Sequence, residues 1–453
     1  MNNADIPIKK ANTIADIFEA VGETRPLTIA EMDQFYLDTD AVRGDLSTRR
    51  RLASIIRKNA ASGRNGHILF VGARGAGKST ELNHLQKDIE NEILVFNYSV
   101  LKELDPQSIS YIELFIVTME KLFDYALQNN LEVDKSLLSR ISKWTSTKEI
   151  KEIKDKHLSI EASAGTDTKA GIPFLHQFFF QLKGAAKASK SFKETLKDTI
   201  EPRLSDLISF CNELIAEIRI KALNAGFNDI IIVIEDLDKI PLETANRLFF
   251  NYANQLVQLK ATVIYTFPVT LNYNKLFNTI SGYFSEVVDL PMIKVNQKDG
   301  QPFLAGRQVL KKIVTARINQ SLFANETILD KMVEMTGGAL RGLFRMVNDA
   351  AFAAEDRGKA MIGEEEYVYA FRQIKRDYEN TIADFTVNGI TIITADQYFK
   401  ELANLAMSTD KQPTNSDILM DLRQNLSVLS YNGENWCDVH PVMKEILKER
   451  RYI

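Results

Sequence analysis

The segment GARGAGKS, from Gly72 to Ser79, contains the residue types that hold a phosphate chain, and it fits G-x-x-x-x-G-K-[ST] at every fixed position. Glycines let the backbone curl so that its N–H groups point inward around an anion, and a following helix N-terminus adds partial positive charge. We expect Lys78 to reach the β- and γ-phosphates of a nucleotide and Ser79 to bind Mg²⁺. The residues expected to surround the phosphates are Gly72, Ala73, Arg74, Gly75, Ala76, Gly77, Lys78, Ser79 and Thr80.

A second motif, IIIVIEDLD from Ile230 to Asp238, places carboxylates directly after a run of β-branched residues. Such a run is typical of a central parallel strand that is buried on both faces. Carboxylates at the end of that strand, beside the phosphate loop, would face the phosphates. We expect Glu235 to hold the magnesium shell through water, and Asp236 to orient or deprotonate an attacking water. A solvated strand end is the alternative interpretation of the same residues.

The segments around these motifs alternate between expected strands and expected helices. This alternation predicts an α/β core with a parallel sheet. Residues 130 to about 200 interrupt it and are predicted to form an insertion, whereas residues 305–375 are helical in pattern throughout. The expected strands are 67–71, 93–98, 230–234, 261–267 and 284–290, and the expected helices include 46–60, 79–89, 111–128, 246–260 and a long helix from Leu204.

In their order along the chain, the phosphate loop, the acidic strand, the segment VIYTFPVT and the segment GGALRGL resemble AAA+ and STAND ATPases. They are especially similar to origin-recognition-like and KAP-type bacterial and archaeal ATPases, over about residues 35–355. The resemblance implies a three-layer α/β P-loop NTPase core with a parallel sheet, and ATP with Mg²⁺ as its ligands. Glu235 stands where the family has Asp, and Asp236 where fast hydrolases commonly have Glu, so slow turnover remains open.

The same resemblance implies roles for residues outside the two motifs. In VIYTFPVT, Thr266 is the expected sensor-1 residue, with Thr270 and Asn272 as alternatives. In GGALRGLF, Arg341 is the expected sensor-2 residue that reaches the γ-phosphate from a lid, with Arg345 one turn later as the substitute. A strand-end hydroxyl and a surface arginine are the respective alternatives.

Two further resemblances are weaker. The segment FYLDTDAVRG resembles the part of these families that packs over the adenine, where Asp40 and Arg43 could contribute. Arg247 and Arg307 are candidates for an arginine finger offered to a neighbouring subunit, although neither lies in an identifiable motif.

The C-terminal segment contains two β-prone runs, LSVLSY and WCDVH, on either side of a turn at residues 432–434, and an expected helix follows. That order resembles the wing and closing helix of a winged-helix domain. We therefore expect an N-terminal lead-in segment (1–45), a P-loop ATPase core (46–300) with the insertion at about 130–200, a helical lid (301–375) and a winged-helix-like C-terminal domain (376–453).

The composition is typical of a globular protein, and the formal net charge is −4. A surface that binds nucleic acid would therefore have to be a local basic patch. Cys211 and Cys437 are too far apart in sequence for a disulfide framework, and no signal peptide is recognised, which favours the cytoplasm. The apolar stretch 171–186 is too short and too polar to span a bilayer.

Two basic clusters could contact phosphates of DNA or RNA. A solvated helix face explains the first cluster at least as well and the second cluster better. One is a set of lysines at helical spacing in the insertion, and the other lies near the C-terminus. They comprise Lys183, Lys187, Lys190, Lys193 and Lys197, and Lys444, Lys448, Arg450 and Arg451.

These observations favour an ATP-binding and ATP-hydrolysing switch of the AAA+/STAND class that controls assembly or a partner effector. Bacterial antiviral defence is one setting that the resemblance implies. The expected partners are further copies of the chain or a separate effector protein, with no membrane. Two alternatives remain open: an origin-recognition-like ATPase that binds DNA, and a scaffold that binds nucleotide without hydrolysing it.

Overall fold

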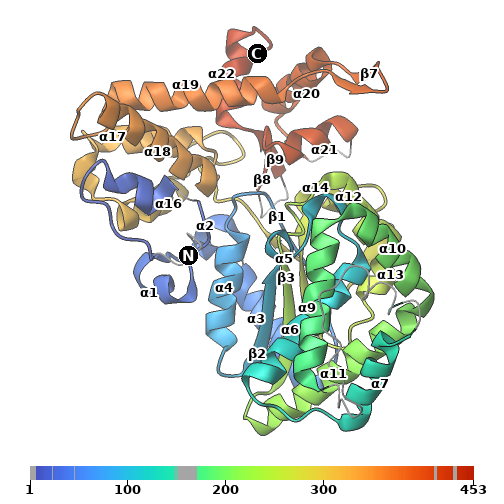
Figure 1. Cartoon of the computed structure of the whole chain (residues 1–453). Coiled ribbons are helices and arrows are strands. Elements are labelled where there is room, and N and C mark those ends of the chain that lie inside the picture. The colour runs from blue at the N-terminus through green and yellow to red at the C-terminus, as the bar shows by residue number, and fades with distance from the viewer. Residues whose placement is uncertain are drawn as a thin grey trace.

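The computed structural model describes residues 7–22, 24–44, 46–147, 150, 171–412, 416–431 and 436–453. Figure 1 shows two lobes, a core lobe built around a parallel sheet and an upper lobe that contains the long helix α19 (Glu364–Thr381) and the C-terminus. Most of the upper lobe consists of residues after 300, and the N-terminal segment lies against it. Among the described residues, no helix is both long and apolar enough to cross a bilayer.

The core sheet has five parallel strands in the order β2-β3-β4-β1-β5. Each strand begins and ends within two residues of its predicted range, and every residue of β3 is buried, as its β-branched run predicts. The order places β4 between the phosphate-loop strand β1 and the acidic strand β3. The strands are β1 (His67–Gly72), β2 (Ile93–Ser99), β3 (Asp229–Glu235), β4 (Thr262–Pro268) and β5 (Glu286–Leu290).

Helices cover both faces of this sheet, because alternate strand residues face two separate apolar cores. Leu69 and Val71 face the larger core, whereas Ile68 and Phe70 face the smaller one. The smaller core is closed by α3 (Thr48–Ser62) and α4 (Lys78–Ile89). The larger core is closed by α6 (Tyr111–Gln128), α7 (Lys135–Thr145), α9 (Ile172–Ala188), α10 (Lys190–Ile200) and α11 (Leu204–Asn224). The predicted three-layer α/β P-loop core is confirmed.

Short helices connect the strands and differ from the expected pattern in one place. The helix predicted for 246–260 is divided into α12, a π-helical turn at Arg247–Asn251 and α13. The short helices are α5 (Val100–Glu103), α12 (Leu242–Asn246), α13 (Ala253–Leu256), α14 (Val269–Asn272) and α15 (Phe277–Ser281).

The lysines of the insertion do not form a single exposed face. The chain breaks between α9 and α10, so the helical spacing is not continuous. Lys183 is buried and forms ion pairs with Glu103 and with Glu120, the latter at 3.2 Å. Lys193 lies 3.1 Å from the carboxylate of Glu113. The predicted basic stripe is therefore partly an internal set of ion pairs between the insertion and the core.

The lid contains α16 (Leu304–Arg317), α17 (Glu326–Met335), α18 (Leu340–Asp356) and α19, and the N-terminal segment is built into it. Ala11, Ile14 and Ile17 are buried in the same apolar core as these helices. The amide of Ala11 donates to the Arg317 carbonyl (2.8 Å), and its carbonyl accepts from the Asn319 amide (2.9 Å). The helices α1 (Met32–Phe35) and α2 (Asp40–Arg43) then lead to the core. The expected lead-in segment is thus an integral part of the lid.

The C-terminal segment folds as the sequence order predicts: β8 and β9 pair in an antiparallel hairpin, and α22 follows them. A second, shorter hairpin of β6 and β7 was not predicted. The elements are β6 (Phe385–Val387), β7 (Ile390–Ile393), α20 (Ala395–Met407), α21 (Asp417–Gln424), β8 (Val428–Tyr431), β9 (Trp436–Val439) and α22 (Pro441–Glu449).

This C-terminal segment contacts both the lid and the core. The hydroxyl of Tyr431 donates to the Gly337 carbonyl in the loop before α18 (2.7 Å). On the core side, the Thr270 hydroxyl in α14 donates to the Gln424 side chain (3.2 Å). The guanidinium of the buried Arg423 lies 3.9 Å from the ring centre of Tyr273. The C-terminal segment therefore rests on the loop that follows β4.

His440 at the start of α22 makes stability depend on pH. Burial lowers its pKa to about 3, and its Nδ1 accepts from the Val442 amide (3.3 Å). An unfolded histidine takes up a proton near pH 6.5, whereas this one stays neutral until about pH 3. The contribution of His440 to stability is therefore complete above about pH 6.5 and is lost as the pH falls toward 3.

We expect His440→Asn to show a smaller loss of unfolding free energy than wild type between about pH 6.5 and 4.5. Asparagine keeps a short acceptor for the Val442 amide but does not titrate. Urea denaturation at several pH values measures this, and the comparison at about pH 8 separates the loss of packing from the loss of titration. An unchanged acid slope would show that His440 is not the group responsible.

Candidate nucleotide-binding site

The phosphate loop joins the end of β1 at Gly72 to the start of α4 at Lys78. Gly75 and Gly77 have φ angles of 78° and 102°, in the left-handed region that other residues rarely adopt. At Gly75 a Cβ atom would also lie 2.9 Å from the Cβ of Arg341, so this glycine lets the lid approach closely. The residues at both positions are therefore required by geometry as well as by the motif.

Lys78 is almost completely buried, and oxygen atoms from three parts of the core surround its ammonium group. Its Nζ donates to the carbonyls of Gly72 (2.6 Å) and Ala73 (2.9 Å), and it lies 2.9 Å from a carboxylate oxygen of Asp238. Burial lowers the pKa of Lys78, and the charge of Asp238 opposes that change. Sequence analysis assigned no role to Asp238, although it lies within the acidic motif.

The structure brings the two predicted metal residues together. Glu235 at the end of β3 hydrogen-bonds with the Ser79 side chain, and its Oε1 accepts from the Asn97 amide at 2.8 Å. Burial raises the pKa of Glu235, and these hydrogen bonds oppose the increase. Asn97 is on the neighbouring strand β2, and only the pairing of β2 with β3 identifies it.

Asp236 adopts a left-handed backbone with φ of 69°, which is uncommon for a residue with a side chain and is found mainly in turns and functional sites. Its carboxylate accepts a hydrogen bond from Ser99 at the end of β2 and lies 2.5 Å from the Lys239 ammonium. The carboxylate predicted to handle water is thus held in place by two neighbours that sequence reasoning missed.

Thr266 lies on β4, between the phosphate-loop strand and the acidic strand. Its buried hydroxyl accepts from the Leu237 amide (3.0 Å) and donates to the Ile234 carbonyl (3.4 Å). It therefore fixes the turn in which Asp236 and Asp238 lie. Thr270, one of the alternatives, bonds to the C-terminal segment instead.

The lid supplies Arg341, in the first turn of α18 and beside Gly75. Arg345 lies outside the cleft and forms ion pairs with Asp349 and Asp377. Neither Arg247 nor Arg307 lines the cleft. Arg307 donates to the Val295 carbonyl (2.9 Å) and so belongs to the lid's own packing.

Arg43 connects the N-terminal segment to the phosphate loop. Its buried guanidinium donates to the carbonyl of Ala76 in the loop (2.7 Å), to the carbonyl of Pro291 after β5, and to the Thr39 hydroxyl (2.7 Å). Burial lowers the pKa of Arg43, and the charge of Glu81 opposes this. The resemblance implied that Arg43 could contribute to packing over the adenine. Arg43 lines the cleft, and its side-chain hydrogen bonds are with backbone carbonyls and the Thr39 hydroxyl. Asp40 does not line the cleft.

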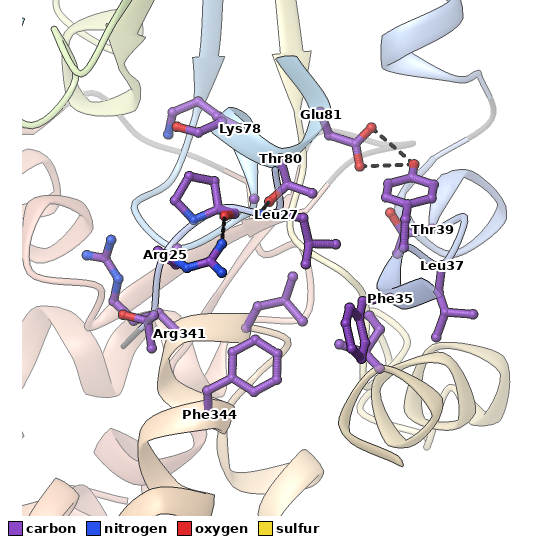
Figure 2. A pocket seen from close by; sticks show the side chains of 18 of the residues that line it. Arg25, Leu27, Phe35, Leu37, Thr39, Lys78, Thr80, Glu81, Arg341 and Phe344 are labelled. Carbon is purple, nitrogen blue, oxygen red and sulfur yellow. Dashed lines mark hydrogen bonds between the residues drawn. The ribbon is translucent and has the colours of Figure 1, made fainter. Parts of the chain in front are cut away.

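A cleft lies between the phosphate loop, the N-terminal segment and the lid. Figure 2 shows Lys78 and Thr80 on one side of it and Phe344 of α18 on the opposite side, with Leu27 between them. Arg25 and Arg341 lie along one edge, and Phe35 and Leu37 along another. The lining is polar and charged at the loop. At the lid it combines an apolar wall of Ile313, Leu340 and Phe344 with Arg317 and Arg341, which suits a triphosphate attached to a planar base.

The residues present fit a magnesium nucleotide. The described residues contain no group of three or more His, Cys, Asp or Glu side chains that could hold a metal ion. Mg²⁺ commonly binds through one or two protein oxygens and takes its other ligands from phosphates and water. Ser79 and Glu235, whose side chains hydrogen-bond with each other, supply two such protein oxygens.

The sheet order, the phosphate loop and the acidic strand together define a P-loop NTPase core of the three-layer α/β class. In this arrangement a lid helix closes over the loop. No family model matches the chain, and no curated protein matches it in sequence.

Solved structures align with most of the chain at TM-scores below 0.5. Cdc6p from Pyrobaculum aerophilum is 12% identical with a TM-score of 0.39, covering 96% of this chain and 98% of its own. A Walker-type ATPase of Pyrococcus abyssi is 14% identical with a TM-score of 0.43, covering 94% and 99%. The ORC1 protein of Aeropyrum pernix, solved in complex with DNA, is 12% identical with a TM-score of 0.36, covering 91% and 95%.

Asp238 gives the first test of the site. We expect Asp238→Asn to bind ATP about three- to tenfold more tightly than wild type, because a negative charge next to the phosphates is removed. The same change should lower the stability of the protein without nucleotide by about 2 kcal/mol or more, because the buried Lys78 loses its counterion. Titration calorimetry and thermal unfolding measure the two effects. The exposed Asp299→Asn is the matched control, and weaker ATP binding by Asp238→Asn would contradict the prediction.

Proposed function

We propose that this protein is an ATP-binding and slowly ATP-hydrolysing molecular switch. The observation that carries the proposal is that Lys78 and Ser79 of the phosphate loop line one cleft together with Arg341 of the lid, while Ser79 hydrogen-bonds with Glu235 at the end of β3. A phosphate chain held there would contact core and lid simultaneously. The presence of a γ-phosphate would therefore change how firmly the lid is held.

Each residue has a distinct role in this proposal. The loop amides and Lys78 bind the β- and γ-phosphates, and Ser79 with Glu235 holds Mg²⁺, which would neutralise charge on the phosphates when bound. Asp236 orients a water molecule that attacks the γ-phosphorus, so that the bond to the β-phosphate oxygen breaks and ADP and phosphate are released. Arg341, which is on the lid, stabilises the negative charge that develops on the phosphoryl group during its transfer. Thr266 holds the turn in which Asp236 lies.

Slow turnover follows from the surroundings of Asp236. Its carboxylate is engaged by Ser99 and by Lys239, and its side chain is one methylene shorter than glutamate. Oxygen atoms that are already engaged by Ser99 and Lys239 are less available to orient a water molecule. The same observation supports a second candidate, a scaffold that binds ATP and does not hydrolyse it.

The C-terminal segment is the element through which we propose that the switch acts. It contacts the Gly337 carbonyl next to the lid helix α18, and it contacts α14 directly after the strand that carries Thr266. Movement of the lid would strain the first contact and leave the second in place. We propose that the bound nucleotide determines whether this winged-helix-like segment stays in contact with the lid. The segment would in turn control self-assembly or an effector protein.

The cellular setting is proposed from the resemblance to STAND ATPases, which favours control of an effector, as in bacterial antiviral defence, in the cytoplasm. DNA binding has less support, because Lys183 and Lys193 of the insertion form buried or half-buried ion pairs. A native pull-down with and without nuclease distinguishes a protein partner from DNA.

We expect Lys78→Ala to lose tight ATP binding, by about a hundredfold or more, because the phosphates lose their central cation. Asp236→Asn should keep ATP affinity within a few-fold and stop phosphate release. Lys87→Ala, on the exposed side of the same helix, is the control. Equal affinity in wild type and Lys78→Ala would rule out the cleft. Undetectable turnover in wild type with normal binding would favour the scaffold.

We also expect nucleotide to change the assembly state of the protein. Gel filtration with light scattering, in ADP and in a slowly hydrolysed ATP analogue with Mg²⁺, should give different masses for wild type and equal masses for Lys78→Ala. Identical profiles for wild type in both nucleotides would count against a switch that acts through self-assembly.

A further inference from the structure

Arg317, the last residue of α16, is a buried cation whose side chain donates no hydrogen bond to any residue that the structure describes. Only 6% of the residue is exposed, and its Nε has no hydrogen-bond partner. None of the described residues forms an ion pair with it. A guanidinium carries five N–H donors, and leaving such a group buried without acceptors is destabilising.

The surroundings of Arg317 explain why no carboxylate neutralises it. The nearest acidic group that influences it is Glu31, whose carboxylate already accepts from Arg25 (2.5 and 2.8 Å), the Ile8 amide and the Thr28 amide. Burial lowers the pKa of Arg317 to about 10, with the charge of Glu31 opposing the shift. Arg317 is therefore still charged at neutral pH.

One partner of Arg317 is aromatic. The carbon atom at the centre of its guanidinium lies 4.5 Å from the ring centre of Phe344, a contact that supports the charge but provides no hydrogen-bond acceptor. Both residues line the cleft, and Phe344 lies across it from Lys78 and Thr80 (Figure 2). The unused donors of Arg317 are thus found at the apolar wall opposite the phosphate loop.

We propose that Arg317 binds the base of the nucleotide by donating to a ring acceptor atom, while Phe344 supports the guanidinium. This assignment rests on the proposed function, because it takes the triphosphate to be held at Lys78. The ligand class is a nucleoside triphosphate with a purine base, whose ring nitrogens are acceptors that can lie in an apolar cleft. Arg317 would then be a specificity-determining residue rather than a structural one.

The unpaired state of Arg317 makes a distinctive prediction about stability. A structural arginine stabilises the protein when no ligand is bound, so its loss lowers the melting temperature. A binding arginine that is buried without acceptors does the opposite, and its replacement by an apolar side chain of similar length leaves the melting temperature equal or higher. Arg317→Met keeps the apolar stem and its packing and removes the donors.

The test compares Mg·ATP with inorganic tripolyphosphate, which has the phosphates but no base. For Arg317→Met we expect about tenfold or weaker ATP binding, because charged hydrogen bonds are lost, and tripolyphosphate affinity within twofold of wild type. The melting temperature without ligand should be unchanged or raised. Arg345→Met, which removes an exposed arginine of the lid outside the cleft, should change none of these values.

Each outcome separates this inference from the proposed function. If wild type binds neither ATP nor tripolyphosphate, the proposed function is wrong. If wild type binds both, and Arg317→Met binds ATP equally well or loses both ligands to the same extent, only the role of Arg317 in base binding is wrong. Should Arg317→Met fail to fold, its unpaired guanidinium is structural and the inference is overturned. Phe344→Leu should weaken ATP and not tripolyphosphate, which checks the same subsite independently.

Discussion

The burial of one ammonium group, Lys78 Nζ, constrains the arrangement of the whole core. A desolvated cation must be surrounded by oxygen atoms, and here they come from the end of β1, from the phosphate loop and from Asp238 beyond β3. Because β4 lies between β1 and β3, those oxygens can converge only if the turn after β3 folds back over β4. The hydroxyl of Thr266 holds that turn through the Leu237 amide. The strand order and the polar residues at the strand ends thus serve one requirement, which is to surround the Lys78 ammonium with oxygen atoms.

The sequence predicted the elements whose signals are local. The five strands were found because each is a short apolar run bounded by turn residues, and the phosphate loop because its glycines and Lys78 have fixed spacing. Ser79 and Glu235, which the two motifs assign to the same metal ion, hydrogen-bond with each other in the structure. The helix predicted for 246–260 was less accurate, because a π-helical turn at Arg247–Asn251 interrupts a pattern that is apolar on more than one side.

The residues that the sequence missed depend on pairings between distant segments. Asn97 and Ser99 contact the acidic residues at the end of β3 only because β2 pairs with β3. No local sequence pattern indicates the register of that pairing. Arg43 was noticed, but its contacts with Ala76 and Pro291 depend on how the N-terminal segment crosses the core. The lysines of the insertion do not share one exposed face for two reasons. The chain breaks between α9 and α10, and the acidic partners of the buried Lys183 lie on other elements.

The pairing of Ala11 with Arg317 and Asn319 places the beginning of the chain inside the lid. The polypeptide consequently passes between the lid and the core twice, once through residues 24–44 and once through residues 291–303. A motion that keeps both connections intact is restricted to a rotation about the line that joins them. Two connections therefore limit the movement of the lid relative to the core more strictly than one connection would.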